Sequence, residues 1–248
     1  MFKLTHKKVV ITGGCSGIGK SIALTFLAQG AEVHVIDLKP AAEPLPSDIN
    51  LHLADITNIE SVKAIADKLG SIDILVNNTG GPPPTLAAGQ DPALWQKSFN
   101  DMVLSLISIT DRVLPGMRQR KWGRIITSTT SGAIAPIKNL AISNTLRAAL
   151  LAWSKTLAAE VAAEGITVNV IMPGRVATDR LRQLDEARAQ RENVSYDSVV
   201  QASLKQIPMG RYGDPQEYGD TAAFLASQSA SFITGSVIRV DGGQIQAI

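Results

Sequence analysis

The chain has 248 residues, of which 45% are hydrophobic and 19% are charged, and its formal net charge is +2. This length and apolar content predict a folded domain with a large buried core and exclude a disordered chain. The small charge, with no cluster of basic residues, argues against nucleic acid as a partner, and the single cysteine excludes a disulfide and a thiolate metal cage, so no metal is expected.

The first apolar run begins within ten residues of Met1, which leaves no room for a signal peptide. No apolar stretch reaches the length that spans a membrane. We therefore expect a cytoplasmic protein with no membrane partner.

Short apolar runs alternate with longer amphipathic segments along the chain. The runs carry Val, Ile and Leu on both faces, as is typical of parallel strands that helices cover on both sides. Strands are predicted at residues 8–12, 32–37, 51–54, 72–77, 124–128, 167–171 and 237–240.

Between these runs, apolar residues recur at helical spacing. Helices are predicted at residues 16–29, 58–69, 92–120, 141–163 and 215–227, and three prolines leave little room for a helix in 39–50. Since the chain has no internal repeat or linker, we expect residues 1–248 to form one α/β domain, doubly wound around a parallel sheet of about seven strands.

Residues 12–19 read Thr-Gly-Gly-Cys-Ser-Gly-Ile-Gly and join the first strand to the first helix. Such a turn lets the backbone approach a pyrophosphate, which the N–H groups at the helix start can bind. Asp37 ends the second strand, 18 residues after Gly19, where an acid can accept hydrogen bonds from an adenosine ribose. The spacing predicts a Rossmann domain that holds a dinucleotide.

Further motifs follow in order: NNTG at 77–80, GRII at 123–126, GITVNVIMPG at 165–174, MGRYGDPQE at 209–217, SFITG at 231–235 and VDGG at 240–243. Together with TGGCSGIG at 12–19, they resemble the short-chain dehydrogenase/reductase family, in particular its 3-oxoacyl-carrier-protein reductase branch. The resemblance runs over almost the whole chain. It implies an NAD(P)-dependent oxidoreductase that transfers a hydride between a nicotinamide and a carbonyl or alcohol substrate.

The resemblance also implies which residues hold the cofactor. Those expected at its phosphate, ribose and adenine groups are Gly13, Ser16, Gly17, Ile18, Gly19, Asp37, Leu38, Asp55, Ile56, Asn77 and Gly80. Those expected at the nicotinamide end are Pro173, Gly174, Val176 and Thr178. Asp37 favours NAD(H) over NADP(H), because its charge repels a 2′-phosphate, although Lys39 lies close enough to soften this. The simpler alternatives are a solvated strand-end acid for Asp37 and a helix cap for Asp55.

The catalytic residues of the family are not retained. Its members use Asn, Ser, Tyr and Lys, and the matching positions hold Met102, Thr130, Ser143 and Arg147. A serine alcohol is a far weaker acid than a phenol, and Arg147 can donate to the nicotinamide ribose but cannot release a proton near neutral pH. We assign Thr130, Ser143 and Arg147 as candidate catalytic residues, with Arg147 also in the cofactor set. Asn100 is expected on another helical face and is no substitute.

Two functions therefore stay open. One is a slow enzyme, because a lost general acid costs about 10²–10⁴ in rate, whereas holding hydride donor and acceptor together is worth roughly 7–11 kcal/mol. The other is an inactive dinucleotide-binding protein that acts as a sensor or partner subunit. His6, His34 and His52 lie in the first three strand regions and are expected to be surface or strand-filling residues.

A variable substrate lid is expected at about residues 179–207. It carries Arg180, Arg182, Arg188 and Arg191, which form either a solvated helix face or a basic rim for an acidic substrate such as an acyl thioester. The two long helices have surplus apolar residues, including Trp153, and in the family such helices pair across a two-fold axis while the C-terminal region, here 244–248, makes a second contact. We therefore expect a homotetramer, with a homodimer as the fallback.

Overall fold

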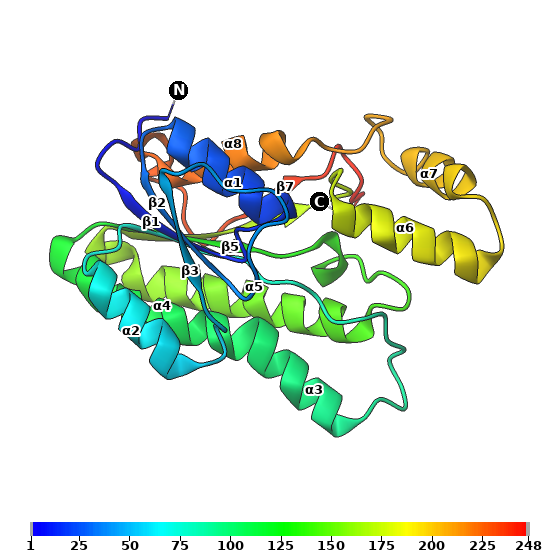
Figure 1. Cartoon of the computed structure of the whole chain (residues 1–248), viewed down its shortest axis with the longest axis horizontal. Coiled ribbons are helices and arrows are strands. Elements are labelled where there is room, and N and C mark those ends of the chain that lie inside the picture. The colour runs from blue at the N-terminus through cyan, green and yellow to red at the C-terminus, as the bar shows by residue number, and fades with distance from the viewer. Residues whose placement is uncertain (1, 247–248) are drawn as a thin grey trace.

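The computed structural model describes residues 2–246 and consists of a seven-stranded sheet with helices on both faces (Figure 1). The strands are β1 (Lys8–Thr12), β2 (Glu32–Asp37), β3 (Ile49–Leu53), β4 (Ile74–Asn77), β5 (Gly123–Ser128), β6 (Ile166–Pro173) and β7 (Val237–Val240). Their spatial order is β3-β2-β1-β4-β5-β6-β7, and every neighbouring pair is parallel. The predicted doubly wound parallel sheet is confirmed. The strand order reverses between β1 and β4, which is where such sheets bind ligands, at the carboxyl ends of the strands.

The helices cover both faces of this sheet. They are α1 (Gly17–Ala28), α2 (Ile59–Leu69), α3 (Pro92–Phe99), α4 (Ser105–Arg120), α5 (Ala141–Val161), α6 (Asp179–Glu192), α7 (Tyr196–Leu204) and α8 (Pro215–Ala226). In Figure 1, α1 and α8 lie above the sheet, and α2, α4 and α5 lie below it. No helix separates β2 from β3, as the prolines predicted.

Successive side chains of β1 point alternately to the two faces of the sheet, and on both faces they enter an apolar core. Val9 and Ile11 belong to the core cluster that contains Phe26 of α1 and Tyr218 of α8. Val10, between them, packs into the opposite cluster with residues of α2, α4 and α5. Successive side chains of a strand point to opposite faces, so a sheet covered on both sides needs an unbroken apolar run.

The helix predicted at 92–120 contains an irregular turn. Its middle, η1 (Asn100–Leu104), is a π-helix, between α3 and α4. A π-turn inside an α-helix often marks a functional site. Here it includes Met102, which is expected from the sequence at the position of a catalytic Asn.

The helices α6 and α7 extend beyond the sheet at the right of Figure 1, where the substrate lid was expected. Each begins at a side-chain cap: Thr178 accepts a hydrogen bond from the Leu181 N–H, and Ser195 from the Ser198 N–H. No helix within residues 2–246 has the length and apolarity to cross a membrane.

Candidate functional site

A cleft of about 320 Å³ lies at the carboxyl ends of β1, β2 and β4. Among the residues expected at the adenosine half of the cofactor, those that line it are Gly13, Asp37, Leu38, Asp55, Ile56 and Gly80. Segments far apart in sequence thus meet at the point where the strand order reverses. The cleft also extends to Gly81 and Pro82, in the loop after β4.

The glycine-rich turn beside this cleft has the geometry that a pyrophosphate needs. Gly13 and Gly17 have φ angles of +63° and +50°, which favour glycine. A Cβ atom on Gly19 would lie 2.0 Å from the Gly13 carbonyl oxygen, so only glycine fits there. The side chain of Ser16 precedes α1 without capping it, which leaves the first N–H groups of α1 without a side-chain acceptor. These residues therefore fit a dinucleotide phosphate.

Asp37 connects the end of β2 to the same turn. Its Oδ2 atom accepts a hydrogen bond from the Cys15 N–H at 2.9 Å. Burial, together with the Asp37 charge, raises the pKa of the Cys15 thiol to about 11, so this thiol stays protonated at neutral pH and is not a nucleophile.

Asp55 is exposed at the cleft. Its Oδ1 atom accepts hydrogen bonds from the N–H and the hydroxyl of Thr57, at 2.8 and 2.7 Å, and these bonds lower the pKa of the carboxyl. Its carboxylate therefore remains charged at neutral pH.

Asn77 does not line the cleft. It is fully buried, and its Nδ2 atom donates to Thr110 of α4 at 3.0 Å. Asn78 lines the cleft instead and donates to the carbonyls of Thr12 and Gly13. Neighbouring residues at a strand end face opposite sides, so the side chain that faces the cleft here is that of Asn78, and that of Asn77 points away from it.

The segment expected at the nicotinamide end follows β6 directly. The Gly174 N–H donates to the Val240 carbonyl, Val176 is buried, and the Thr178 side chain caps α6. A Cβ atom on Gly17 would lie 3.5 Å from Thr178 Cγ2, and both residues line a second hollow of about 410 Å³. The fold therefore brings the phosphate turn and the loop after β6 into contact.

Arg147 is buried and donates to three backbone carbonyls. Its Nη2 atom donates to Thr79 and Gly80 at 2.7 and 3.0 Å, and its Nη1 atom donates to Ser128 at 3.1 Å. Burial lowers the pKa of Arg147 to about 10, so the guanidinium is still protonated at neutral pH. Arg147 thus ties α5 to the ends of β4 and β5.

A buried tyrosine on the other side of the sheet extends this network. The hydroxyls of Tyr218 and Ser128 are 3.1 Å apart, and the Tyr218 hydroxyl donates to the Ile171 carbonyl at 2.8 Å. Burial raises the pKa of Tyr218, so its hydroxyl stays protonated at neutral pH. No sequence pattern indicates this contact, because Tyr218 and Ser128 are 90 residues apart.

Thr130 and Ser143 lie on neighbouring elements. Thr130 caps the short 3₁₀ helix η2 (Ser131–Ala133) and accepts a hydrogen bond from the Gly132 N–H at 3.4 Å. Ser143 is half-buried in the first turn of α5, and a Cβ atom on Gly81 would be 3.9 Å from its hydroxyl oxygen. Ser143 therefore lies near Gly81, which lines the cleft that starts at Asp37, although Ser143 is not itself a lining residue.

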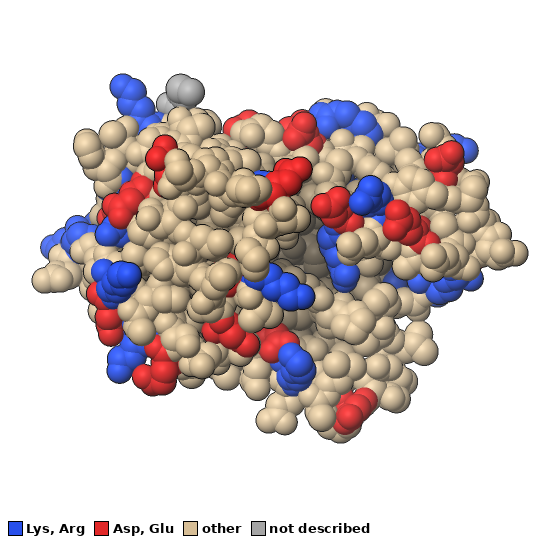
Figure 2. Space-filling model, in the orientation of Figure 1, with Lys and Arg blue, Asp and Glu red and all other residues tan. Residues whose placement is uncertain are grey.

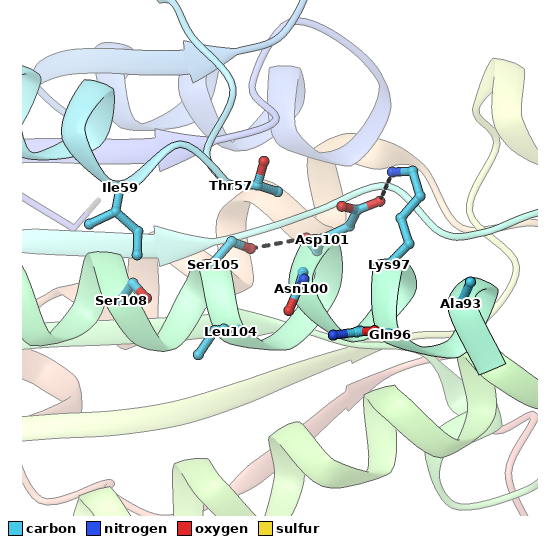
Figure 3. Close-up of a pocket in the computed structure, with 10 residues that line it drawn as sticks. All are labelled: Thr57, Ile59, Ala93, Gln96, Lys97, Asn100, Asp101, Leu104, Ser105 and Ser108. Carbon is cyan, nitrogen blue, oxygen red and sulfur yellow. Dashed lines mark hydrogen bonds and ion pairs between the residues drawn. The ribbon is translucent and has the colours of Figure 1, made fainter.

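Asn100 and Met102 lie on different sides of η1. Met102 lines the cleft, whereas Asn100 lines a separate pocket of about 460 Å³ on the outer face of α3 and α4. Figure 3 shows this outer pocket, with Lys97 and Asp101 paired at its edge. Asn100 is therefore not placed to replace the Asn of the family.

Within residues 2–246, no three His, Cys, Asp or Glu side chains are gathered where they could hold a metal ion.

Residues 13–244 match the family model described as enoyl-(acyl carrier protein) reductase.

Curated relatives match over nearly their full length. The chain is 34% identical to the 3-oxoacyl-[acyl-carrier-protein] reductase FabG of Vibrio cholerae, covering 97% of this chain and 98% of that one. It is 33% identical to the acetoacetyl-CoA reductase of Shinella zoogloeoides, covering 95% and 97%.

Solved structures of oxidoreductases have the same fold as this chain. The aldohexose dehydrogenase of Thermoplasma acidophilum superposes with a TM-score of 0.91 at 27% identity, covering 100% of this chain and 98% of that one. The L-sorbose reductase of Gluconobacter frateurii, in complex with NADPH and L-sorbose, gives 0.90 at 28% identity and covers 99% of each chain. The chain therefore belongs to the short-chain dehydrogenase/reductase family of oxidoreductases, in its 3-oxoacyl-carrier-protein reductase-like branch.

Proposed function

We propose that this protein is an NAD-dependent oxidoreductase that transfers a hydride between the nicotinamide and a carbonyl or alcohol substrate, with non-standard catalytic residues. The observation that carries the proposal is the single cleft that begins at Asp37 and ends at Gly81, beside the Ser143 hydroxyl. A dinucleotide bound at Asp37 and at the phosphate turn would direct its reactive end toward Thr178 and Ser143.

The preference for NAD(H) rests on Asp37. Its carboxylate lies in the cleft, held by the Cys15 N–H, and a fixed negative charge repels a 2′-phosphate. The L-sorbose reductase of similar structure was solved with NADPH, so membership of the family does not by itself select the coenzyme.

When bound, the nicotinamide would supply or accept the hydride. The hydroxyls of Thr130 and Ser143 would donate hydrogen bonds to the substrate oxygen, and water, directly or through Ser143, would deliver the proton. Arg147 holds the wall of the cleft at Thr79 and Gly80, and its buried charge favours negative charge that develops on a nearby oxygen. A guanidinium has five N–H groups, so those that remain beyond its three backbone bonds are the ones that would bind the nicotinamide ribose.

The second candidate is a dinucleotide-binding protein with little or no turnover, acting as a sensor or partner subunit. The engagement of Arg147 with backbone carbonyls favours it, since this cation then stabilises the fold rather than assisting a proton donor.

One experiment separates the two candidates. NADH oxidation is measured with 3-oxoacyl thioesters, sugars and simple ketones, the classes suggested by the relatives, and NADH binding is measured on the same sample by calorimetry. Binding with turnover supports the enzyme, and binding without turnover in any class supports the sensor or partner subunit. Absence of NADH binding contradicts both.

We also propose a homotetramer. The outer faces of α2, α3 and η1 expose Ile59, Phe99 and Leu104, which are 57%, 40% and 41% accessible. Trp153, in contrast, is half-buried against the chain's own core and gives less support than its sequence position suggested. Residues 247–248 of the expected C-terminal contact lie outside the described residues.

A further inference from the structure

One arginine of the lid helix α6 differs from the other three. Arg182, Arg188 and Arg191 lie 3.0–3.9 Å from carboxylates of the same helix, namely Asp179, Glu186 and Glu192. Arg180 makes no ion pair with any of the described residues, and its side chain is exposed. A solvated helix face whose arginines pair with carboxylates of the same helix therefore accounts for three of the four arginines. It does not account for Arg180.

Arg180 reaches from the lid to the wall of the cleft. Its Nη2 atom donates to the Pro82 carbonyl at 3.4 Å, across a sequence separation of 98 residues. Pro82 and Gly81 line the cleft, and Gly81 is the residue beside Ser143. Arg180 therefore contacts the wall of the cleft at Pro82, next to Gly81, which is the cleft residue beside Ser143. Its bond to Pro82 is long, exposed and easily exchanged for a stronger acceptor.

The position of α6, and with it that of Arg180, is fixed by a buried ion pair. Asp185 is 1% exposed, and its Oδ1 atom accepts from Arg175 at 2.7 Å. Its Oδ2 atom accepts from the Tyr212 hydroxyl at 2.7 Å, and burial, helped by this bond, raises the pKa of Tyr212. Arg175 follows β6, so α6 is attached directly to the loop expected at the nicotinamide.

We propose that the substrate carries an anionic group, a carboxylate or a phosphate, which Arg180 binds at the mouth of the pocket while the reacting carbonyl or alcohol lies inward at Thr130 and Ser143. The inference rests on the proposed function and assigns its substrate class. A guanidinium presents a planar fork of N–H donors that matches both anions, and it remains charged at any physiological pH. Figure 2 shows a hollow between the lid and the body of the molecule, with both basic and acidic side chains beside it.

The test measures binding, so that it does not depend on turnover. Protein saturated with NAD⁺ cannot reduce an oxo compound, so calorimetry reports the affinity of the pocket for it. The carboxylate arm compares 2-, 3- and 4-oxo acids with their methyl esters, and the phosphate arm compares dihydroxyacetone phosphate with dihydroxyacetone. We expect the charged member to bind about tenfold or more tightly than its neutral partner in one arm, and that arm identifies the anion.

Two variants assign the effect to one side chain. Arg180→Gln should abolish the preference for the charged member, whereas Arg191→Gln, which removes a charge of the same helix that is already paired with Glu192, should retain it. Equal binding of charged and neutral probes in both arms, absence of binding by all of them, or a preference that survives Arg180→Gln would overturn the proposal. Each of these results leaves the proposed function standing if NAD⁺ still binds, whereas loss of NAD⁺ binding in the parent contradicts the proposed function itself.

Discussion

The Nη2 atom of Arg147 donates to the carbonyl oxygen of Thr79 at 2.7 Å, which joins α5 to the end of β4. The same guanidinium also reaches Gly80 and Ser128, so one side chain satisfies acceptors from two strand ends. A lysine ammonium at this position is a single point charge and lacks the planar fork that serves several carbonyls together. The planar fork of Arg147 therefore braces the wall of the cleft.

Arg147→Ala should lower the free energy of unfolding by roughly 1–3 kcal/mol or more, since it leaves buried carbonyls without donors. Arg147→Lys should lose less, because one donor and the charge remain. Urea unfolding followed by circular dichroism measures both, with Arg191→Ala on the exposed lid surface as the control. NADH affinity should fall with Arg147→Ala, because Thr79 and Gly80 line the cleft. An unchanged unfolding midpoint would show that the three bonds do not stabilise the fold.

Most of the fold could be predicted from the sequence because its signals are local. The boundaries of β1, β2 and β7 agree with the predicted 8–12, 32–37 and 237–240, since apolar runs and turn residues mark strands directly. The helices α6 and α7 could not be predicted individually from the sequence, because residues 179–207 pack few apolar side chains. The π-turn at Met102 has no sequence pattern of its own.

The site was predictable only in part. Gly13, Asp37 and Asp55 meet in the cleft because strand order places them there. The choice between Asn77 and Asn78 depended on which face each side chain takes, and the partners of Arg147 are backbone carbonyls, which carry no side-chain signature. The Arg175–Asp185 pair joins two segments whose packing only the folded lid defines.

NADH should raise the melting temperature more than NADPH at equal concentration, because ligand affinity adds to the free energy of unfolding and the Asp37 charge opposes a 2′-phosphate. Asp37→Ser should narrow or reverse the difference, and Asp48→Ser, an exposed acid outside the cleft, should not. Differential scanning fluorimetry measures all three proteins. Equal shifts by the two coenzymes in the parent would count against the role of Asp37.

Acidification should destabilise the chain through a histidine pair on β2 and β3. His34 Nδ1 and His52 Nε2 are 3.1 Å apart, and His34 Nε2 is 2.8 Å from Glu32. Since one nitrogen of the pair must accept, both rings cannot be charged while this bond is kept. Burial, followed by the charges of His34 and Lys68, lowers the pKa of His52 below its ordinary value of 6.5.

Proton linkage gives the direction in which stability changes with pH. A histidine whose pKa is lower when folded binds protons more readily in the unfolded state, so stability falls as the pH drops below about 6.5 toward the folded pKa. His52→Gln should flatten this decrease between about pH 7 and pH 5, where most carboxylates stay ionised. Urea unfolding across this range tests it, and parallel pH profiles for parent and variant would contradict the prediction.

Light scattering at micromolar concentration should give the mass of a tetramer, or of a dimer as the fallback. The exposed Phe99 and Leu104 on the outer face of α3 and η1 leave apolar surface that association would bury. Leu104→Glu should shift the mass toward smaller species, and Leu38→Glu, an exposed leucine at the cleft, should not. A monomeric parent would refute the assembly.

Ser143→Ala should leave NADH affinity nearly unchanged while lowering any turnover, because Ser143 lies beside Gly81 at the end of the cleft rather than at its adenosine half.

Introducing the Asn, Ser, Tyr and Lys that the resemblance implies should raise carbonyl reduction. Ser143→Tyr with Arg147→Lys comes first, since Met102→Asn places an amide among Ile142 and Leu146 and costs about 1–3 kcal/mol if unpaired. Thr130→Ser and Met102→Asn are then added, with circular dichroism and NADH binding verifying each variant. If parent and restored chains both fold and bind NADH yet neither reduces any carbonyl, the pocket is not built for hydride transfer, and the sensor or partner subunit is the better account.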